Sequence, residues 1–396
     1  MKKLIILRGP SLCGKTSLVK ELGLENNVIS PDDVRRMFYG YEIYEDTTRI
    51  LKKDNFKIFK EVYTIVEQRM EYGLLTVIDH TNLIEQNIEK YRNLCFKYGY
   101  EAIVVNFKSS LNELLEKNKG LEHPYEEEKI RDEYKEFTSQ KIPNFCKVIA
   151  PQQLKSEISF RYPDMSKYKK VVHIGDIHGC ATVLKEALGN MDFNTLYVFC
   201  GDYIDRGLEN IDVLKFLIEI KRKPNVILLK GNHELNLVRY VNGEETYSKS
   251  FERTQQEIEN SDLEARDLRD LCKCMKNYFA YNYKGKKIIA THGGISSLKD
   301  LALVSEYSFI MGSGDMDKTN VDEEFQNNTR DVVQVHGHRN PFDIEISKYN
   351  RSFNLEGAVE DGGCLRTLEI NEKGNFTGRT YENKIFSSRP VKSYED

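Results

Sequence analysis

The second half of this 396-residue chain carries five short motifs whose side chains could hold metal ions. In order they are Gly-Asp-Ile-His-Gly (175–179), Gly-Asp-Tyr-Ile-Asp-Arg-Gly (201–207), Gly-Asn-His-Glu (231–234), Thr-His-Gly-Gly (291–294) and His-Gly-His-Arg (336–339). Mixed aspartate, asparagine and histidine ligands suit Mn²⁺, Fe or Zn²⁺ better than Ca²⁺. One aspartate or histidine says little, but the ordered set predicts hydrolysis of a phosphoester by two metal ions.

The first half carries a phosphate-binding loop of the pattern Gly-x-x-x-x-Gly-Lys-[Ser/Thr], preceded by an apolar run and followed by a helical pattern. Its glycines let backbone N–H groups point at phosphate oxygens, and the following helix adds its positive amino end. We expect Lys15 to neutralise the β and γ phosphates of ATP, and Thr16 to offer its hydroxyl to Mg²⁺. The residues expected to contact ATP are Gly9, Ser11, Cys13, Gly14, Lys15, Thr16 and Ser17.

A second segment of the first half combines a helix start with unpaired charges. Ser30 and Pro31 predict the first residues of a helix, and Asp33 would close a capping box. At helical spacing Asp32 and Arg35 lie on one face. A carboxylate that accepts a proton from a hydroxyl, beside a cation that holds the acceptor's phosphate, is the minimum requirement of a 5′-hydroxyl kinase.

These motifs, together with Asp-His-Thr-Asn at 79–82 after an apolar run, resemble the kinase module of bacterial and phage polynucleotide kinase–phosphatases. The resemblance implies that Asp32 is the general base, with Asp33 as the fallback, and that Arg35 clamps the acceptor's 3′ phosphate. It also implies an acceptor pocket that is lined by Asp79, Thr81 and Asn82.

The lid is where the chain departs from that family. The family's lid carries arginines that grip the ATP phosphates, whereas the segment 116–120 here carries only lysines. Lysine is a point charge and cannot make the bidentate fork of arginine. Lys117 and Lys119 are the expected lid residues, a solvated charged loop is the alternative, and Arg131 is a further candidate.

The five motifs of the second half resemble the binuclear metallophosphoesterases. The branch in question includes serine/threonine protein phosphatases, dinucleoside tetraphosphatases and the phosphatase module of bacterial polynucleotide kinase–phosphatase. The resemblance implies that Asp202 bridges two metal ions, which a shared carboxylate can hold about 3.5–4 Å apart. The residues it assigns to the two metal ions are Asp176, His178, Asp202, Asn232, His292 and His338.

The same resemblance implies the groups that assist the metal ions. His233 is the expected general acid toward the leaving oxygen, Asp205 orients it, and Arg206 clamps the phosphate. His336 is expected to be a supporting residue or a strand residue, because the family's ligand histidine directly follows the glycine. Glu356 stands where many relatives have an aspartate, and it could orient a ligand histidine.

Alternating apolar runs and helical patterns predict an α/β fold with parallel sheets covered by helices. We predict a P-loop kinase domain over 1–150, a linker over 151–170 and a metallophosphoesterase α/β sandwich over 171–396. A helical insertion at about 235–283 is either a solvated addition or a lid or substrate-recognition subdomain. The expected strands are 3–7, 74–79, 103–107, 171–174, 196–200, 226–229 and 287–290, and the expected helices of the first half are 15–22 and 50–72.

Composition excludes several classes of protein. The net charge of −4 and the pI of about 6.2 provide no global positive field, so any nucleic-acid contact must come from local basic clusters. Eight cysteines without a Cys-x-x-Cys pattern indicate reduced thiols in a cytoplasmic protein. We expect no membrane partner, because no apolar run is long enough to span a bilayer.

A site that adds phosphate and a site that removes it suggest healing of nucleic-acid ends. The kinase would use ATP and Mg²⁺ on 5′-OH ends, and the phosphatase would use two divalent cations, with Mn²⁺ expected, on 3′-phosphate or 2′,3′-cyclic phosphate ends. The expected partners are RNA or DNA ends, with RNA favoured by the resemblance, and a separate ligase, because the chain stops at Asp396. The oligomeric state stays open.

Two other functions remain open. The first is a phosphoprotein or dinucleoside polyphosphate phosphatase joined to a small-metabolite kinase, because phosphatase motifs leave the leaving group unspecified. The second is a nucleotide-sensing module with an inactive kinase. Asp32 argues against the second, because a protein that only binds nucleotide has no use for a base beside the acceptor.

Overall fold

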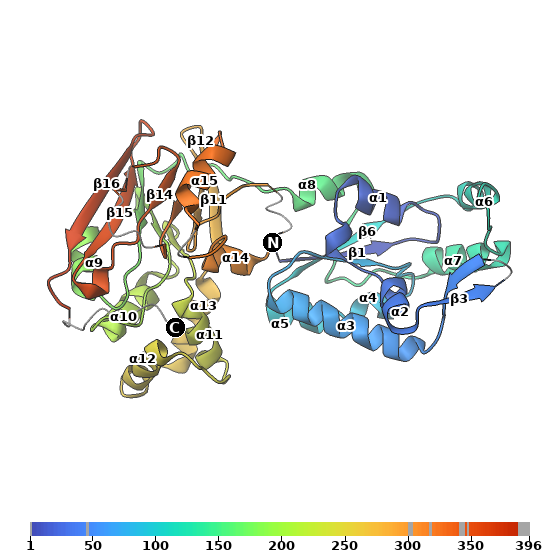
Figure 1. Cartoon of the computed structure of the whole chain (residues 1–396), viewed down its shortest axis with the longest axis horizontal. Helices are drawn as coiled ribbons and strands as arrows, with labels where there is room; N and C mark the ends of the chain where they lie inside the picture. Colours follow the sequence, from blue (N-terminus) through green and yellow to red (C-terminus); the bar gives the residue numbers. More distant parts are fainter. Residues whose placement is uncertain are drawn as a thin grey trace. The chain divides into compact units, whose positions relative to one another are not determined.

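The computed structural model describes residues 2–44, 47–299, 304–316, 319–339, 345–346 and 348–386. The chain divides into two compact units, one reaching to Ser159 and one beginning at Phe160. Each unit is built of helices around β-sheets (Figure 1). The α/β fold class predicted from the alternating pattern is confirmed.

The first unit is organised around a parallel five-stranded sheet with β1 at its centre. The sheet order is β2-β5-β1-β6-β7, which are Val28–Ile29, Thr76–Asp79, Lys3–Arg8, Glu101–Asn106 and Lys147–Ile149. Side chains alternate along β1, so that Leu4 and Ile6 join one hydrophobic cluster and Ile5 and Leu7 join another. Both faces of the sheet are therefore covered, as the continuous apolar run predicts.

Helices cover this sheet: α1 (Lys15–Glu21), α2 (Pro31–Tyr39), α3 (Asn55–Glu71), α4 (Glu85–Glu89), α5 (Arg92–Tyr98), α6 (Leu111–Lys119), α7 (Glu127–Ser139) and α8 (Leu154–Ile158), with a 3₁₀ turn at Glu25–Asn27. The helix predicted from residue 50 begins later, at Asn55. The preceding residues instead form a hairpin of β3 (Tyr41–Tyr44) and β4 (Thr47–Ile50). The Asp54 side chain then accepts a hydrogen bond from Lys57 N, which caps the helix there.

The predicted linker over 151–170 is largely folded, so that prediction is wrong in extent. A 3₁₀ turn at Pro151–Gln153 leads into α8, whose Leu154 and Ile158 are buried in the core of the first unit. Tyr168 is buried in the core of the second unit. Two apolar residues four apart bury one short helix face, and so short a pattern carries no visible periodicity in the sequence.

The second unit is a sandwich of two sheets. One sheet has the order β10-β9-β8-β15-β16, which are Val226–Leu228, Thr195–Phe199, Lys170–Ile174, Cys364–Ile370 and Phe376–Glu382. The other has the order β11-β12-β13-β14, which are Tyr278–Tyr283, Lys286–Thr291, Val332–His336 and Ser352–Asn354. Val198 of the first sheet and Tyr281 and Ile288 of the second belong to one hydrophobic cluster, so the two sheets pack face to face.

Helices cover the outer face of the sheet that contains β9. They are α9 (Ala181–Leu188), α10 (Asn210–Ile220), α11 (His233–Val241), α12 (Lys249–Glu259) and α13 (Ala265–Cys274), which share a core with that sheet. The remaining helical segments are α14 (Glu306–Met311), α15 (Val321–Asn328) and the 3₁₀ turn Val359–Asp361. Among the described residues, no helix has the length and apolar content needed to cross a membrane.

The helical insertion predicted to reach residue 283 ends earlier. Its helices are α11 to α13, and Tyr278–Tyr283 is the strand β11, paired antiparallel with β12. The turn between them consists of Lys284 and Gly285 with φ of 50° and 79°, which is the left-handed backbone of a two-residue hairpin. The predicted insertion therefore extends too far, because this aromatic-rich strand follows directly on charged helices.

Candidate functional sites

The five motifs of the second unit lie at the carboxyl ends of parallel strands. Asp176, Asp202 and Asn232 follow β8, β9 and β10, which are parallel neighbours. His292 and His338 follow β12 and β13, which are parallel neighbours in the other sheet. Because carboxyl ends of parallel strands meet at one edge, the packed sheets bring the motifs together.

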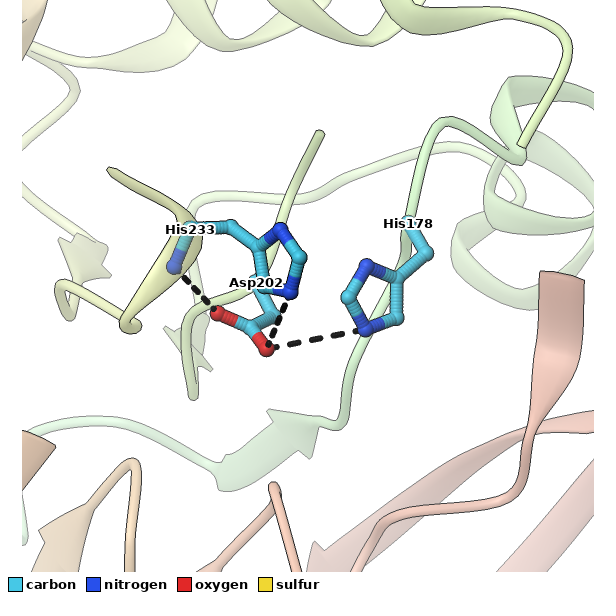
Figure 2. Close-up of side chains that lie close together, drawn as sticks. All are labelled: His178, Asp202 and His233. Atoms are coloured by element: carbon cyan, nitrogen blue, oxygen red, sulfur yellow. Dashed lines mark hydrogen bonds and ion pairs between the residues drawn. The ribbon is translucent and has the colours of Figure 1, made fainter. Parts of the chain in front are cut away.

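Asp202 lies at the centre of this site. Its Oδ1 lies 3.2 Å from His292 Nε2, and its Oδ2 lies 3.5 Å from His178 Nε2. Figure 2 shows the rings of His178 and His233 approaching the same oxygen of the Asp202 carboxylate, Oδ2. One amide atom of Asn232 lies 3.0 Å from His292 Nε2 and 3.0 Å from His338 Nδ1.

The potential ligand atoms form three overlapping groups, each within 4.8 Å. They are His178 with Asp202 and His233, Asp202 with His292 and His338, and Asp176 with His178 and Glu356. Asp202 belongs to two groups, as a bridging carboxylate would. Glu356, expected to orient a histidine, instead lies among the ligand atoms themselves.

Backbone strain concentrates at this site. Positive φ angles, unusual for residues with a side chain, occur at His178 (40°), Asp202 (50°), Asp205 (74°), Arg206 (63°) and His338 (64°). Neighbouring glycines leave room for the ligands: a Cβ at Gly337 would lie 1.7 Å from Asp176 Oδ1. The left-handed backbone at these residues therefore follows from the direction in which their side chains point into the site.

Backbone carbonyls orient the histidine ligands. Nδ1 of His178 lies 3.1 Å from the Ile204 carbonyl, and Nδ1 of His292 lies 3.0 Å from the Cys200 carbonyl. Each pairing leaves Nε2 facing Asp202, which is how a histidine ligand is usually held.

Glu234 supports the loops that carry the ligands, and sequence reasoning missed it. Its carboxylate accepts hydrogen bonds from the backbone N–H groups of Asp202, Tyr203 and Gly231 at 2.8–2.9 Å. Burial raises the pKa of Glu234 to about 7, with the Asp202 charge adding to the effect. The signal was present, because Glu234 is the last residue of Gly-Asn-His-Glu.

Buried carboxyl groups lie close together in this site, which favours the binding of cations. Burial raises the pKa of Asp176 well above its usual value, and the Glu356 carboxyl beside it adds to the rise. Asp176 Oδ1, Glu360 Oε2 and His338 Nε2 are buried with no hydrogen-bond partner among the described residues. Unpartnered buried ligand atoms of this kind fit divalent metal ions.

His233 and Asp205 form a second arrangement beside the metal ligands. His233 Nδ1 lies 2.7 Å from Asp205 Oδ2, and the Thr254 hydroxyl donates to Asp205 Oδ1. Burial lowers the pKa of His233, but the nearby Asp202 and Asp205 outweigh it and raise the value overall. Thr254 belongs to α12, so the helical insertion holds this pair in place.

Two further predicted residues have identifiable partners. Arg206 NH1 lies 3.1 Å from Glu360 Oε1, at the edge of the ligand groups. His336, expected to be a supporting or strand residue, is the last residue of β13, and its Nε2 lies 3.0 Å from Asp322 Oδ1. His336 belongs to none of the ligand groups found among the described residues.

In the first unit the phosphate-binding loop joins β1 to α1. Lys15 Nζ donates to the carbonyls of Gly9 and Pro10 at 2.9 and 2.8 Å. Thr16 Oγ1 donates to Asp79 Oδ2 at 3.1 Å, so the end of β5 lies against the loop. Burial raises the pKa of Asp79.

Asp32 and Arg35 form an ion pair on α2, as their spacing predicts. Arg35 NH1 lies 2.6 Å from Asp32 Oδ1, and Arg35 NH2 donates to Asn55 Oδ1 at 2.8 Å. Arg35 is buried, whereas 61% of the Asp32 side chain is exposed. The guanidinium is thus fixed and the carboxylate is accessible.

His80 lies between the charges of the loop and those of α2. Burial lowers the pKa of His80 to about 4, and the charges of Asp32, Lys15 and Arg35 also act on it. His80 was not assigned a role from the sequence, although it belongs to the Asp-His-Thr-Asn segment.

One expectation for this unit is wrong: Asp33 closes no capping box, because its carboxylate pairs with Arg36 at 2.9 Å. Asn82 is buried, and its amide donates to the carbonyls of Leu7 and His80 at 2.7 and 3.1 Å, while its role toward an acceptor stays a prediction. Thr81 contributes its carbonyl, which accepts a hydrogen bond from Gly9 N at 3.0 Å.

The predicted lid residues have different partners. Lys117 Nζ reaches the Leu12 carbonyl of the phosphate-binding loop at 3.4 Å, whereas Lys119 pairs with Glu116 at 2.8 Å on an exposed face. Arg131 pairs with Glu127 at 3.3 Å, also exposed. Cys13 is buried in the loop, and burial raises the pKa of its thiol.

Comparison with known proteins agrees with the geometry of both units. Residues 169–370 match the family model of the calcineurin-like phosphoesterases. This chain belongs to the calcineurin-like phosphoesterase family. Residues 4–139 match the model of an AAA domain, so this calcineurin-like phosphoesterase also carries a P-loop, kinase-like domain.

The similar sequences are hydrolases of phosphate compounds. A symmetrical bis(5′-nucleosyl)-tetraphosphatase of Wigglesworthia glossinidia brevipalpis is 32% identical over 133 residues, 33% of this chain and 46% of that protein. Serine/threonine-protein phosphatase 2 of Salmonella typhimurium is 34% identical over 112 residues, 24% of this chain and 50% of that protein. The chain thus spans about half the length of these relatives.

One solved structure is a protein serine/threonine phosphatase from Saccharomyces cerevisiae. It is 15% identical, covers 62% of this calcineurin-like phosphoesterase and 93% of its own chain, and has a TM-score of 0.39.

Proposed function

We propose that this protein is a bifunctional enzyme that heals nucleic-acid ends in the cytoplasm, phosphorylating 5′-OH ends with ATP and removing 3′ phosphates or opening 2′,3′-cyclic phosphates. The observation that carries the proposal is the Asp32–Arg35 pair beside the phosphate-binding loop, on a chain that also holds a metallophosphoesterase site. RNA or DNA ends are the substrates, and a separate ligase joins the healed ends.

On the kinase side, each residue has a role that its geometry supports. Asp32, exposed beside the loop, accepts the proton of the attacking 5′ hydroxyl. Arg35, held by Asp32 and Asn55, binds the acceptor's 3′ phosphate. Lys15 binds the ATP phosphates, and Thr16 would offer its hydroxyl to Mg²⁺, which would neutralise charge on the transferred phosphate. Asp79, which accepts a hydrogen bond from Thr16, lines the acceptor pocket.

On the phosphatase side, Asp176, His178, Asp202, Asn232, His292 and His338 would hold the two metal ions, with Glu356 beside them. Bound there, the ions would activate a water and stabilise the charge on phosphate, and Mn²⁺ suits these ligands. His233, held by Asp205, donates a proton to the leaving oxygen. Arg206 binds a phosphate oxygen after leaving Glu360.

A second candidate function for the metallophosphoesterase site is hydrolysis of dinucleoside tetraphosphates. It is favoured by the relatives that carry that name, of which one is 32% identical over 133 residues. The metal site suits either substrate, because ligands to the ions do not contact the leaving group. The kinase-like unit on the same chain favours nucleic-acid ends over dinucleoside tetraphosphates as the substrate of this site.

The test presents purified protein with 5′-OH and 3′-phosphate oligonucleotides, a phosphopeptide and a dinucleoside tetraphosphate. We expect Asp32→Ala to abolish only end phosphorylation and Asp202→Ala to abolish only end dephosphorylation. Glu71→Ala is the control, because Glu71 is an exposed acid at the end of α3. Wild-type protein that ignores oligonucleotides but cleaves the other substrates would refute end healing.

A further inference from the structure

A glutamate of α7 holds the phosphate-binding loop from outside. Glu133 Oε2 accepts a hydrogen bond from Ser11 N at 2.7 Å, and Glu133 Oε1 accepts one from the Ser11 hydroxyl at 3.1 Å. Only 16% of the Glu133 side chain is exposed, and Lys129 Nζ lies 3.9 Å from its Oε1. Two hydrogen bonds to one shielded carboxylate fix the position of Ser11, because bonds to a charged group are stronger than neutral ones. We call this pair of bonds the Glu133–Ser11 clamp.

The residue after Ser11 has an unfavourable backbone. Leu12 has a φ of 66°, in the left-handed region. A side chain destabilises that conformation, so it persists only where neighbouring contacts hold it. The Leu12 carbonyl accepts a hydrogen bond from Lys117 Nζ of α6 at 3.4 Å, which is long for such a bond. The bonds to Ser11 are shorter, so Glu133 contributes more than Lys117 to holding this turn of the loop.

The two helices that supply these contacts are themselves fixed. Leu114 of α6 and Ile130 of α7 are fully buried in the cluster that contains Leu7 of β1. Asn118, near the end of α6, is buried, and its amide makes two hydrogen bonds of 2.8 Å with the backbone N–H and carbonyl of Tyr125. The segment from α6 to α7 therefore has a fixed place on the sheet from which it can hold the loop.

The clamp leaves the second half of the loop available. Among the residues that the structure describes, no protein acceptor takes the backbone N–H groups of residues 13–16. These four groups lead into the first turn of α1, where N–H groups have no acceptor within the helix and favour an anion. The clamp on Ser11 therefore lies next to the expected phosphate site and not in it.

We propose that Glu133 is a positioning residue for ATP: the Glu133–Ser11 clamp holds the left-handed backbone at Leu12 and so keeps the N–H groups of residues 13–16 directed at the phosphates. The proposal rests on the nucleotide binding in the proposed function and does not depend on the acceptor. Glu133 itself contacts no phosphate. The alternative is a carboxylate that competes with phosphate for the loop, and it predicts the opposite change in affinity.

Titration calorimetry of the full chain with a non-hydrolysable ATP analogue and Mg²⁺ tests the proposal. We expect Glu133→Ala to raise the Kd of the analogue roughly tenfold, as the loss of a hydrogen bond to a charged group permits. Glu133→Gln should stay within about threefold of the wild type, because an amide can still pair with both groups of Ser11. Glu136→Ala is the control, because Glu136 is an exposed acid on the same helix.

A second substitution distinguishes loop shape from general damage to the unit. Glycine adopts the left-handed backbone without the cost of a side chain, so in a Leu12→Gly chain Glu133→Ala should raise the Kd less than about threefold. Three results would each overturn the proposal: unchanged affinity in Glu133→Ala, tighter binding in either Glu133 variant, or an equal loss with and without Leu12→Gly.

The same titration separates this proposal from the proposed function. Analogue binding that depends on Glu133, in a chain that phosphorylates no 5′-OH end, would remove the kinase function and support the clamp. End phosphorylation with analogue binding unaffected by Glu133→Ala would remove the clamp alone. A wild-type chain that binds no analogue would rule out both.

Discussion

Glu234 contacts no predicted ligand side chain through a hydrogen bond, yet it governs how the ligands are presented. Its carboxylate gathers three backbone N–H groups from the loops after β9 and β10. Asp202 has a left-handed backbone, and that conformation costs on the order of 1–3 kcal/mol unless surrounding contacts hold it. At the scale of single residues, Glu234 supplies those contacts.

We therefore expect Glu234→Gln to lower metal affinity and phosphatase activity roughly 10- to 100-fold, because an amide has one acceptor oxygen in place of two. Titration calorimetry with Mn²⁺ would measure the affinity. Glu219→Gln on α10 is the control, since the Glu219 side chain is 72% exposed. Unchanged Mn²⁺ affinity in Glu234→Gln would contradict the role assigned to it.

Thr254 acts on the proposed general acid through Asp205. Thr254→Val removes the hydroxyl that donates to Asp205 Oδ1, and we expect the phosphatase kcat to fall about tenfold, as one lost hydrogen bond to a charged group permits. KM and bound metal should not change. Thr254→Ser should restore the rate, because it restores the hydroxyl; failure of serine to do so would indicate a packing role.

At the scale of elements, a buried hydrogen bond joins the two sheets of the second unit. His173 Nε2 of β8 lies 2.9 Å from the Tyr281 hydroxyl of β11, and His173 Nδ1 lies 3.3 Å from the Leu368 carbonyl. A neutral imidazole satisfies both partners, with the proton on Nδ1. Burial accordingly lowers the pKa of His173 to about 4.

This bond predicts a pH dependence of stability. The unfolded chain protonates this histidine near pH 6.5 and the folded chain only near pH 4, so stability is lost as pH falls between those values. Between pH 7 and pH 5 the loss from His173 should be about 2 kcal/mol. His173→Phe should lose less stability over that interval, although it is less stable at pH 7. Denaturant unfolding followed by circular dichroism measures the free energy of unfolding at each pH. An equal dependence on pH in both proteins would contradict this prediction.

The helical insertion also acts at this scale. The sequence left open whether it is a solvated addition or a lid, and its middle helix turns out to reach the site. Thr254 of α12 donates to Asp205 in the loop after β9, and Glu257 of α12 accepts a hydrogen bond from Asn210, the first residue of α10. The insertion therefore positions the loop that carries the proposed acid, whatever it does for substrate.

At the scale of the whole molecule, the proposed phosphorylation and dephosphorylation sites belong to two different compact units. We expect them to be separable by metal as well as by mutation. Chelation followed by Mg²⁺ should restore end phosphorylation alone, and adding Mn²⁺ should restore dephosphorylation, because histidine ligands favour Mn²⁺ over Mg²⁺. Phosphatase activity fully restored by Mg²⁺ would contradict the expected selectivity.

Lys15→Ala provides the mutational counterpart. Removing the ammonium that serves the phosphate-binding loop should lower end phosphorylation at least about a hundredfold. The phosphatase rate should stay within experimental error, because Lys15 belongs to the first unit and the proposed metal ligands belong to the second. Lys20→Ala, on the same helix α1 and exposed, is the control.

The sequence by itself determined the α/β class, the phosphate-binding loop and the five motifs that lie at strand ends. Each of these features depends on contiguous residues. A motif at the end of a strand carries its own glycines and polar side chains, and the carboxyl ends of parallel strands meet at one edge of a sheet. The spacing of Asp32 and Arg35 likewise settled their pairing, because helical geometry is local.

Only the tertiary structure decided which other residues join those sites. Glu356 enters the ligand groups, Thr254 holds Asp205, and the Asn82 amide bonds the Leu7 carbonyl of β1. The hairpin before α3 and the exposed Phe56 were likewise invisible in the helical pattern. The physical reason is that contacts between residues far apart in the chain depend on how sheets and helices pack, and no local periodicity records that packing.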